Sequence, residues 1–412
     1  MSFYGNVELA CPDTIFDLRD AYNADSHPYK VNLGIGAYRD SEGKPWVLPV
    51  VRQVEASLAG DLTLNHEYLP IDGLRSFTDA ALRLLLGSNS TSIVEGRACA
   101  VQSLSGTGGL RLAAEFLLKF HDVRTVYVSR PTWQNHHHIF KSAGFRDIRE
   151  YRYYSKLTKG LDFAGLLDDL KNAPRGSIVI LHACAHNPTG VDPSHEQWEE
   201  IRTVCEQQGL CALFDCAYQG FTTGDVDRDA WAVRHFAGNG LPVLCSMSFS
   251  KNFGLYNERA GVLALITGSP QEETSVRSQL KQLIRGTMSN PPSHGARIVA
   301  TVLNNPALFD EWKGNIQTMS TRIAEMRRLL YEKLLALGTP GNWIHILDHI
   351  GMFTFSGLEP NQVEHMKTHH HIYLLANGRI NMSAITPQNA DYVAKAINET
   401  VTKIPFEDSI AA

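Results

Sequence analysis

The chain has 412 residues, of which 43% are apolar and 20% are charged, and its formal net charge is −5. This composition is typical of a globular protein with a sizeable core, and the lack of a basic block argues against nucleic acid and anionic membranes as partners. No apolar run approaches the roughly eighteen residues of a membrane span, and the acid-containing N-terminal segment resembles neither a secretory signal nor a transit peptide.

The seven cysteines are irregularly spaced, odd in number and include no C-x-x-C pair. This pattern argues against a disulfide framework and a zinc site, and it favours a reducing compartment. We therefore expect a soluble, cytoplasmic protein.

The first chemically suggestive stretch in chain order is LSGTGGLRLAAEFLLKF, residues 104–120. It places glycines directly before a predicted helix, where backbone N–H groups and the hydroxyls of Ser105 and Thr107 can bind a phosphate. The stretch is neither a Walker A sequence nor G-x-G-x-x-G. Taken alone, it is equally typical of an ordinary helix start.

Short apolar runs then alternate with helical patterns through the middle of the chain. Near-continuous apolarity is typical of strands covered on both faces, and it predicts strands at 123–129, 177–185, 209–218, 241–249 and 260–266. Helical patterns lie between them at 161–173 and 194–209, the second ending at Gly209. We predict an α/β fold whose mostly parallel sheet lies between helices, with right-handed crossovers.

One long amphipathic helix is predicted near 307–337, with Gly338 as its stop. A helix of this length can leave one domain and enter another. We predict a large cofactor-binding domain at 46–308, and a smaller α/β domain formed by residues 1–45 together with 309–412.

Polar side chains follow four of the predicted strands, and ligands of parallel α/β sheets bind beyond the carboxyl ends of the strands. We expect one crevice to gather Trp133, Asn187, Asp215, Tyr218 and Lys251. Each residue alone has a structural explanation, such as a turn asparagine or an aromatic side chain at an edge. The lysine is the most telling, because a buried ammonium group is costly unless its charge is used.

Three motifs, HNPTG (186–190), FDCAYQGF (214–221) and SFSKNFGLYNERAG (248–261), together resemble the class I aminotransferases, which are pyridoxal-phosphate enzymes of fold type I. NLGIGAYRD, NHEYLP, SNPPSHGARIV and GRINMS narrow the resemblance to the aspartate aminotransferases, with the cytosolic type closest. The resemblance runs from about Phe16 to Lys403. It implies a reversible ping-pong transfer of the amino group between L-aspartate and 2-oxoglutarate, giving oxaloacetate and L-glutamate.

The resemblance also implies catalytic roles for three residues. Lys251 would hold pyridoxal 5′-phosphate as a Schiff base and, once released, move a proton between the substrate α-carbon and the cofactor. Asp215 would pair with the protonated ring nitrogen, and Tyr218 would hydrogen-bond the phenolic oxygen together with Asn187. Trp133 would stack on the ring face.

The phosphate of the cofactor would be bound by a set of residues that the resemblance identifies as Ser105, Gly106, Thr107, Ser248 and Arg259. Arg259 is the charge-assisted member of this set. Tyr68 resembles a residue that reaches the phosphate of the neighbouring subunit, which implies a homodimer with shared active sites.

Substrate choice would depend on two arginines. Arg379 resembles the residue that binds the α-carboxylate, with Asn187, Trp133 and Gly36 beside it. Arg285 resembles the residue that binds the distal carboxylate across the dimer interface. The alternative interpretation is that Arg285 is only a solvated charge on a helix. Together they favour dicarboxylic amino acids and keto acids as substrates.

Two histidine runs, at 136–138 and 369–371, invite a metal interpretation, but neither has H-E-x-x-H spacing, and we expect no metal. We expect His136 near the cofactor, His182 as an indirect partner of Asp215, and the second run exposed at a helix end.

Two other functions stay open. An aromatic or kynurenine aminotransferase would share the fold and the cofactor, and a binding protein that has lost catalysis would share the fold alone.

Overall fold

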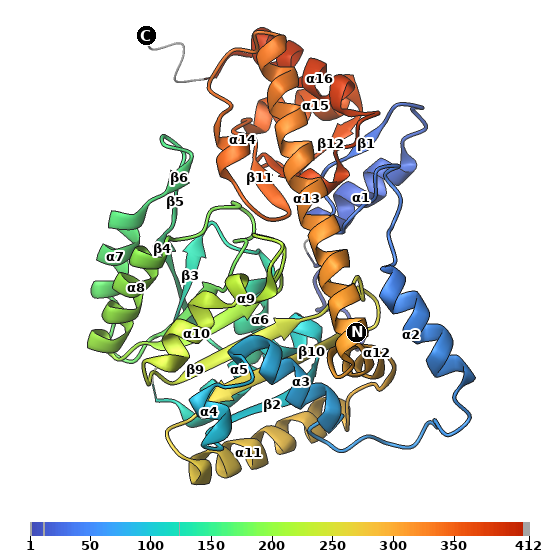
Figure 1. Cartoon of the computed structure of the whole chain (residues 1–412). Helices are drawn as coiled ribbons and strands as arrows, with labels where there is room; N and C mark the ends of the chain where they lie inside the picture. The colour runs from blue at the N-terminus through green and yellow to red at the C-terminus, as the bar shows by residue number, and fades with distance from the viewer. Residues whose placement is uncertain (1, 11–12, 123, 407–412) are drawn as a thin grey trace.

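The structure is a computed structural model that describes residues 2–10, 13–122 and 124–406 (Figure 1). A seven-stranded sheet forms its centre, in the spatial order β2-β10-β9-β8-β7-β3-β4. Its strands are β2 (Ala98–Leu104), β3 (Thr125–Arg130), β4 (Asp147–Arg152), β7 (Ile178–His182), β8 (Cys211–Cys216), β9 (Val243–Ser248) and β10 (Ala260–Ile266).

The predicted α/β fold with a mostly parallel sheet is confirmed. Strands β4, β3, β7, β8 and β9 pair in parallel, whereas β10 runs antiparallel to both β9 and β2. All five predicted strands exist, most of them shorter at the ends, although residue 123 lies outside the described residues. The prediction missed β2, and it missed β4 because that edge strand, DIREYR, is rich in charge.

Helices cover both faces of the sheet, and others lie around the far end of the long helix (Figure 1). Their bounds are α1 (Thr14–Ala24), α2 (Pro49–Gly60), α3 (Arg75–Leu86), α4 (Thr91–Val94), α5 (Ser105–Phe120), α6 (Asn135–Ala143), α7 (Phe163–Lys171), α8 (His195–Gln208), α9 (Val226–Asp229), α10 (Trp231–Gly238), α11 (Pro270–Met288), α12 (His294–Leu303), α13 (Pro306–Ala336), α14 (His345–Asp348), α15 (Pro360–His370) and α16 (Ala390–Lys403). Successive sheet residues belong to two cores, since Leu213 packs with one cluster and Phe214 with the other. This alternation is the period of two expected of a strand buried on both faces.

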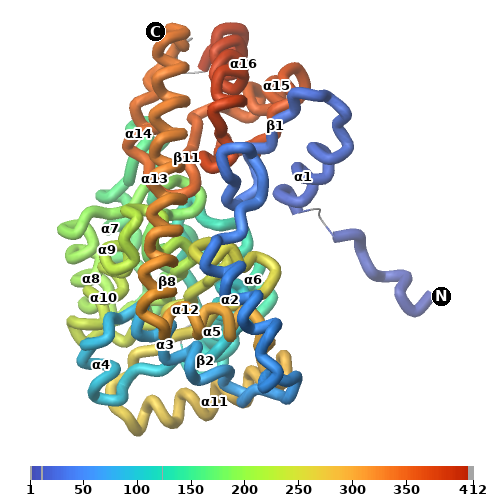
Figure 2. The backbone as a smooth tube through the Cα atoms, turned by 45° about the vertical axis from the view of Figure 1, so that its right-hand side comes forward, coloured from blue at the N-terminus to red at the C-terminus, as the bar shows by residue number. Residues whose placement is uncertain are grey.

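Short strands join the two ends of the chain beyond this sheet. β1 (Val31–Asn32) pairs in parallel with β12 (Ile372–Tyr373), and β11 (Phe353–Phe355) pairs antiparallel with β13 (Arg379–Asn381). A further hairpin joins β5 (Tyr154–Ser155) to β6 (Gly160–Leu161), and a 3-10 turn spans Met382–Ala384. The N- and C-terminal segments therefore lie side by side, as both Figure 1 and Figure 2 show.

The long helix α13 runs from the region of the large sheet to the C-terminal elements (Figure 1). Its start is set by Asn305, whose side chain accepts from the backbone N–H groups of Ala307 and Leu308. The helix spans Pro306–Ala336, close to the predicted 307–337. The domain boundaries at 46–308, and at 1–45 with 309–412, stay a prediction.

One local expectation was wrong. The glycines of SGTGG do not precede a helix, because α5 already begins at Ser105 and they form its first turns. Among the described residues, no helix is long and apolar enough to cross a membrane.

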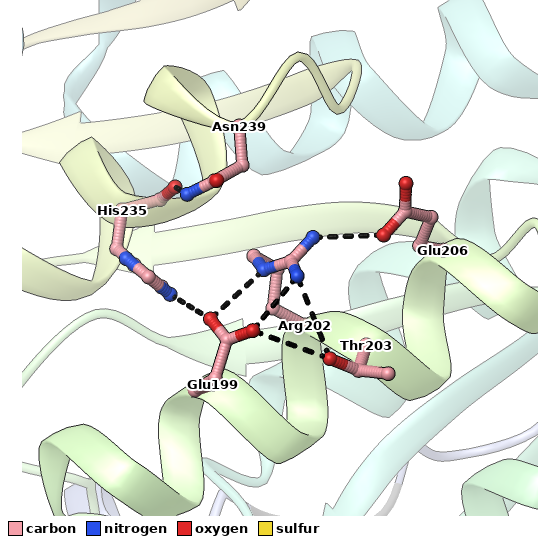
Figure 3. Close-up of polar contacts among 6 residues, drawn as sticks. All are labelled: Glu199, Arg202, Thr203, Glu206, His235 and Asn239. Carbon is pink, nitrogen blue, oxygen red and sulfur yellow. Dashed lines mark hydrogen bonds and ion pairs between the residues drawn. The ribbon is translucent and has the colours of Figure 1, made fainter.

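A surface network ties α8 to α10 on one face of the sheet (Figure 3). Glu199 accepts from Arg202 Nη2 at 2.8 Å and contacts His235 Nε2 at 2.5 Å. Hydrogen bonds from Arg202, and then from His235, lower the pKa of Glu199 to about 2. A carboxyl group whose pKa is depressed stabilises the fold above its ordinary pKa, and this contribution is lost as the pH falls toward its folded value.

We expect Glu199→Gln to lower Tm at pH 7 by about 1 to 2 °C more than Glu200→Gln, which changes an exposed neighbour on the same helix. The difference between the two variants should shrink in 1 M salt, because exposed charges are screened. Calorimetry measures both effects. Equal Tm values for the two variants at low salt would contradict the role given to Glu199.

Candidate active site

Lys251 lies three residues beyond the end of β9 and points toward the N-terminal segment. Its Nζ donates to the carbonyl of Gly36 at 2.6 Å and lies 4.6 Å from the centre of the Tyr256 ring. Within the described parts of the chain, no carboxylate forms an ion pair with it. Burial, followed by the charges of Arg379 and Arg259, lowers the pKa of Lys251 to about 7. The amine is therefore substantially neutral at neutral pH.

Asp215 lies within β8, where its register partners are His182 on β7 and Ser246 on β9. Its Oδ2 is 2.9 Å from Nε2 of the fully buried His136. His136 Nδ1 in turn lies 2.7 Å from the hydroxyl of Thr132, which is 3.3 Å from His182 Nε2. His136 is thus the direct side-chain partner of Asp215, and the His182 side chain is linked to it indirectly, through Thr132 and through the His136 ring, whose centre is 5.2 Å away.

Three hydroxyls and one guanidinium gather where α5 begins and β9 ends. Ser105 Oγ lies 2.8 Å from both Ser248 Oγ and Ser250 Oγ. Arg259 Nη1 donates to Ser250 Oγ at 3.5 Å and to the carbonyl of Tyr256 at 2.9 Å. Burial lowers the pKa of Arg259. Hydroxyl donors around a guanidinium are suited to a phosphate monoester.

The first turn of α5 completes this group. Gly106 approaches β9 closely, since a Cβ atom there would lie 3.2 Å from Ser248 Cβ. Its carbonyl accepts from Ser246 Oγ at 2.8 Å, and the adjacent Thr107 is half-buried. The glycine lets the helix N-terminus reach the strand, and helix N-termini favour anions.

Arg379 opens β13 and is buried. Its Nη1 donates to Asn187 Oδ1 at 3.2 Å, and its Nη2 donates to the carbonyl of Gly34 at 2.5 Å. Its Nε is buried with no hydrogen-bond partner within the described chain. Burial lowers the pKa of Arg379 to about 10. A buried donor without a partner is costly, and a carboxylate ligand would satisfy it.

A cavity of about 210 Å³ opens beside Arg379. Its walls include Trp133, Asn187, Leu375 and, from α1, Ile15. Trp133 also packs edge-on against His136, with ring centres 5.4 Å apart. The cavity therefore joins the Asp215 network to the Arg379 site, and its size suits a small molecule.

Two predicted site residues lie apart from this group within the chain. Tyr68 is 81% exposed, and Arg285 is also exposed near the end of α11, where its Nη1 donates to Ser289 Oγ. Tyr218 is buried and its ring lies 5.9 Å from that of Phe353. Burial raises the pKa of Tyr218.

Sequence reasoning missed several residues that the structure brings into the site. Ser250 had a signal, because it stands between Ser248 and Lys251 in the same motif. Tyr256 stands in that motif too, and Thr132 directly precedes Trp133. Phe353 had no local signal, because it stands in none of the motifs and only strand pairing brings it to Arg379. The histidine prediction was partly wrong: His369 is exposed, but His371 pairs with Asp25 at 2.7 Å. The described residues contain no group of three side chains that could hold a metal ion.

The chain matches the family described as Aminotransferase class I and II over residues 28–397. It is 53% identical over 408 residues to the cytoplasmic aspartate aminotransferase of Gallus gallus, covering 98% of this chain and 99% of the relative.

Two solved structures are similar over nearly the whole chain. The aspartate aminotransferase from Saccharomyces cerevisiae cytoplasm has a TM-score of 0.95 at 46% identity, covering 98% of this chain and 99% of that one. An aromatic-amino-acid aminotransferase from Burkholderia pseudomallei, covalently bound to pyridoxal phosphate, has a TM-score of 0.94 at 43% identity, covering 97% and 100%.

We expect the amine of Lys251 to be unusually reactive near neutral pH. Trace acetylation of the ligand-free protein between pH 5 and 10, read by peptide mass spectrometry, should show Lys251 labelling rise with a midpoint near 7. Lys44 is the control, because its hydrogen bond to Glu42 raises its pKa and its labelling should rise throughout the range. Parallel profiles for the two lysines would contradict the lowered pKa of Lys251.

Proposed function

The chain belongs to the class I and II aminotransferase family, and from this premise we propose that it is an aspartate aminotransferase. The reaction is the reversible, ping-pong transfer of an amino group between L-aspartate and 2-oxoglutarate, giving oxaloacetate and L-glutamate. One observation carries the proposal beyond the comparisons: the carbonyls of Gly36 and Gly34, two residues apart, hold the Lys251 amine and the Arg379 guanidinium side by side.

The residues present fit pyridoxal 5′-phosphate. When bound, this cofactor supplies an aldehyde and a protonated ring that stabilises negative charge at the substrate α-carbon. Its phosphate would be held by the hydroxyls of Ser105, Thr107, Ser248 and Ser250, by the Gly106 turn and by Arg259. Lys251 would bind the aldehyde carbon covalently, and Asp215 would pair with the ring nitrogen. Tyr218 and Asn187 would hydrogen-bond the phenolic oxygen. Trp133 would stack on the ring face.

Lys251 is the general base and acid of the proposed mechanism. Its neutral Nζ would accept the proton from the substrate α-carbon, and the resulting ammonium group would deliver that proton to the cofactor. A pKa near 7 suits this double role, because both protonation states are accessible at neutral pH. Asp215 would pair with the ring nitrogen, and His136, whose Nε2 lies 2.9 Å from Asp215 Oδ2, would hold that carboxylate in place.

Two arginines would set the substrate class. The guanidinium of Arg379, whose Nε has no hydrogen-bond partner within the described chain, would bind the α-carboxylate, with Asn187, Trp133 and Gly36 beside it. Arg285 would bind the distal carboxylate, which makes dicarboxylic amino acids and keto acids the preferred substrates.

We propose a homodimer with shared active sites, because Arg285 and Tyr68 lie outside the cavity of their own chain. Residues 2–10 also extend away from the body (Figure 2), and they expose Phe3 at 93% and Leu9 at 98%. Apolar side chains this exposed favour contact with a partner. The cytoplasmic location expected from the sequence agrees with the name of the Gallus gallus relative.

An aromatic or kynurenine aminotransferase is the second candidate, because the Burkholderia pseudomallei enzyme has nearly the same fold. A binding protein without catalysis is not favoured, since Lys251, Asp215 and Arg379 are all present and buried or half-buried together.

We expect the purified protein to turn over L-aspartate with 2-oxoglutarate, and phenylalanine and kynurenine at least about tenfold more slowly in kcat/KM. Borohydride treatment should attach the cofactor to Lys251, as mass spectrometry of the peptide would show, and Lys251→Ala should abolish both results. Faster turnover of the aromatic substrates would select the second candidate, and a colourless, unreactive protein would select the binding protein.

Replacing Arg285 tests the substrate assignment. We expect Arg285→Ala to lower kcat/KM for aspartate by at least about 100-fold, because the charge pair with the distal carboxylate is lost. Alanine, which has no distal carboxylate, should change by less than about threefold.

The matched control is Lys281→Ala, one turn earlier on α11, whose ammonium pairs with Asp72 at 3.2 Å. It should leave both substrates unchanged. Equal losses for aspartate and alanine in Arg285→Ala would contradict the role of Arg285.

A further inference from the structure

Arg327 is a buried cation that the chemistry above does not use. It lies on α13, is only 4% exposed, and forms no ion pair with any carboxylate of the described chain. Burial lowers its pKa to about 9. A buried guanidinium without a counter-ion is costly, so its three hydrogen bonds should have a structural or functional consequence.

All three hydrogen bonds of Arg327 go to one segment, residues 346–353, which runs from α14 to the start of β11. Nη1 donates to the carbonyl of Ile346 at 3.1 Å, and Nη2 donates to the carbonyls of Gly351 at 2.8 Å and Phe353 at 2.6 Å. Arg327 therefore ties the segment 346–353 to the helix that runs between the large sheet and the C-terminal elements.

The Phe353 ring packs against Arg379, which lines the cavity. It lies under the Arg379 guanidinium, 4.2 Å from its central carbon to the ring centre. A Cβ atom on Gly36, whose carbonyl binds Lys251, would lie 3.0 Å from Phe353 Cζ. The backbone of Phe353 also pairs with Asn381 in the β11–β13 ladder. Displacement of Phe353 would thus shift the guanidinium.

The segment 346–353 also packs against the turn that carries Asn187. Ile350 N donates to the carbonyl of Gly190 at 2.7 Å. A Cβ atom on Gly190 would lie 2.3 Å from the carbonyl oxygen of Phe353, the oxygen that Arg327 binds. Asn187 Oδ1 accepts from Arg379, so two of the groups that contact the guanidinium, Asn187 and Phe353, depend on the position of this segment.

We propose that Arg327 is a positioning residue for the α-carboxylate site. From α13 it holds the segment 346–353 in place, and through this segment Phe353 and the turn that carries Asn187 orient Arg379. The inference rests on the proposed function, since it takes Arg379 to be the α-carboxylate ligand. Arg327 itself touches no substrate. Its effect should therefore fall on binding of every amino acid, whatever the side chain, and little on the proton transfer at Lys251.

The test compares Arg327→Met with Arg328→Met in the cofactor-loaded enzyme. Arg328 is the next residue of the same helix and is exposed, so it controls for the lost charge and helix propensity. We expect Arg327→Met to raise KM for aspartate and for alanine by the same factor, about tenfold, with kcat changed less than about threefold. Arg328→Met should match the unsubstituted enzyme.

A second variant tests the route of the effect. Phe353→Leu should raise KM in the same way, and the double variant should be no worse than the more affected single variant, because both changes release one contact. If Arg327→Met does not fold, Phe353→Leu alone decides: unchanged KM values for both amino acids overturn the inference.

A lowered Tm with unchanged KM in folded, cofactor-loaded Arg327→Met would give Arg327 a purely structural role and overturn the inference. A rise of KM for aspartate but not for alanine would also overturn it, because that is the pattern expected of Arg285. Failure of the proposed function would appear separately, as absence of aspartate turnover in the unsubstituted protein.

Discussion

The rest of this structure depends on one constraint, which is that basic side chains are buried or half-buried without a carboxylate beside them. Lys251, Arg259 and Arg379 are held by backbone carbonyls, hydroxyls and an amide, and none of them pairs with an acid of the described chain. Such groups are costly when they are buried. An anionic ligand would offset this cost of burial when it binds. The region is therefore suited to bind a phosphate at Arg259 and a carboxylate at Arg379.

The segment around Gly34 and Gly36 brings two of these basic side chains together in one site. Its carbonyls receive both the lysine and the arginine, while Asn381 Nδ2 holds the neighbouring carbonyls of Ile35 and Ala37 at 2.6 and 2.9 Å. A segment from the N-terminus is thus fixed by one from the C-terminus, above the ends of the parallel strands. The proposed chemistry therefore requires both ends of the chain to be folded against the large sheet.

The fold was predictable wherever local pattern and tertiary environment agree. Buried parallel strands such as β8 are nearly all apolar, and α8 ends at Gly209 in a left-handed conformation, as its sequence indicates. The charged edge strand β4 was missed because only one of its faces needs apolar residues. The helix α5 begins earlier than expected because its glycines pack against β9, which local propensity does not report.

The sequence by itself determined which groups carry chemistry and in which local order: Lys251 after an apolar run, Asp215 inside another, and Ser-Gly-Thr at the start of a helix. Those choices depend on neighbours in the chain, so they can be read there. Only the tertiary structure decided which groups meet. Gly36 and Lys251 are 215 residues apart, and Phe353 reaches Arg379 through antiparallel pairing of two short strands. Burial and charge proximity follow from such contacts, and they set the pKa of the lysine near 7.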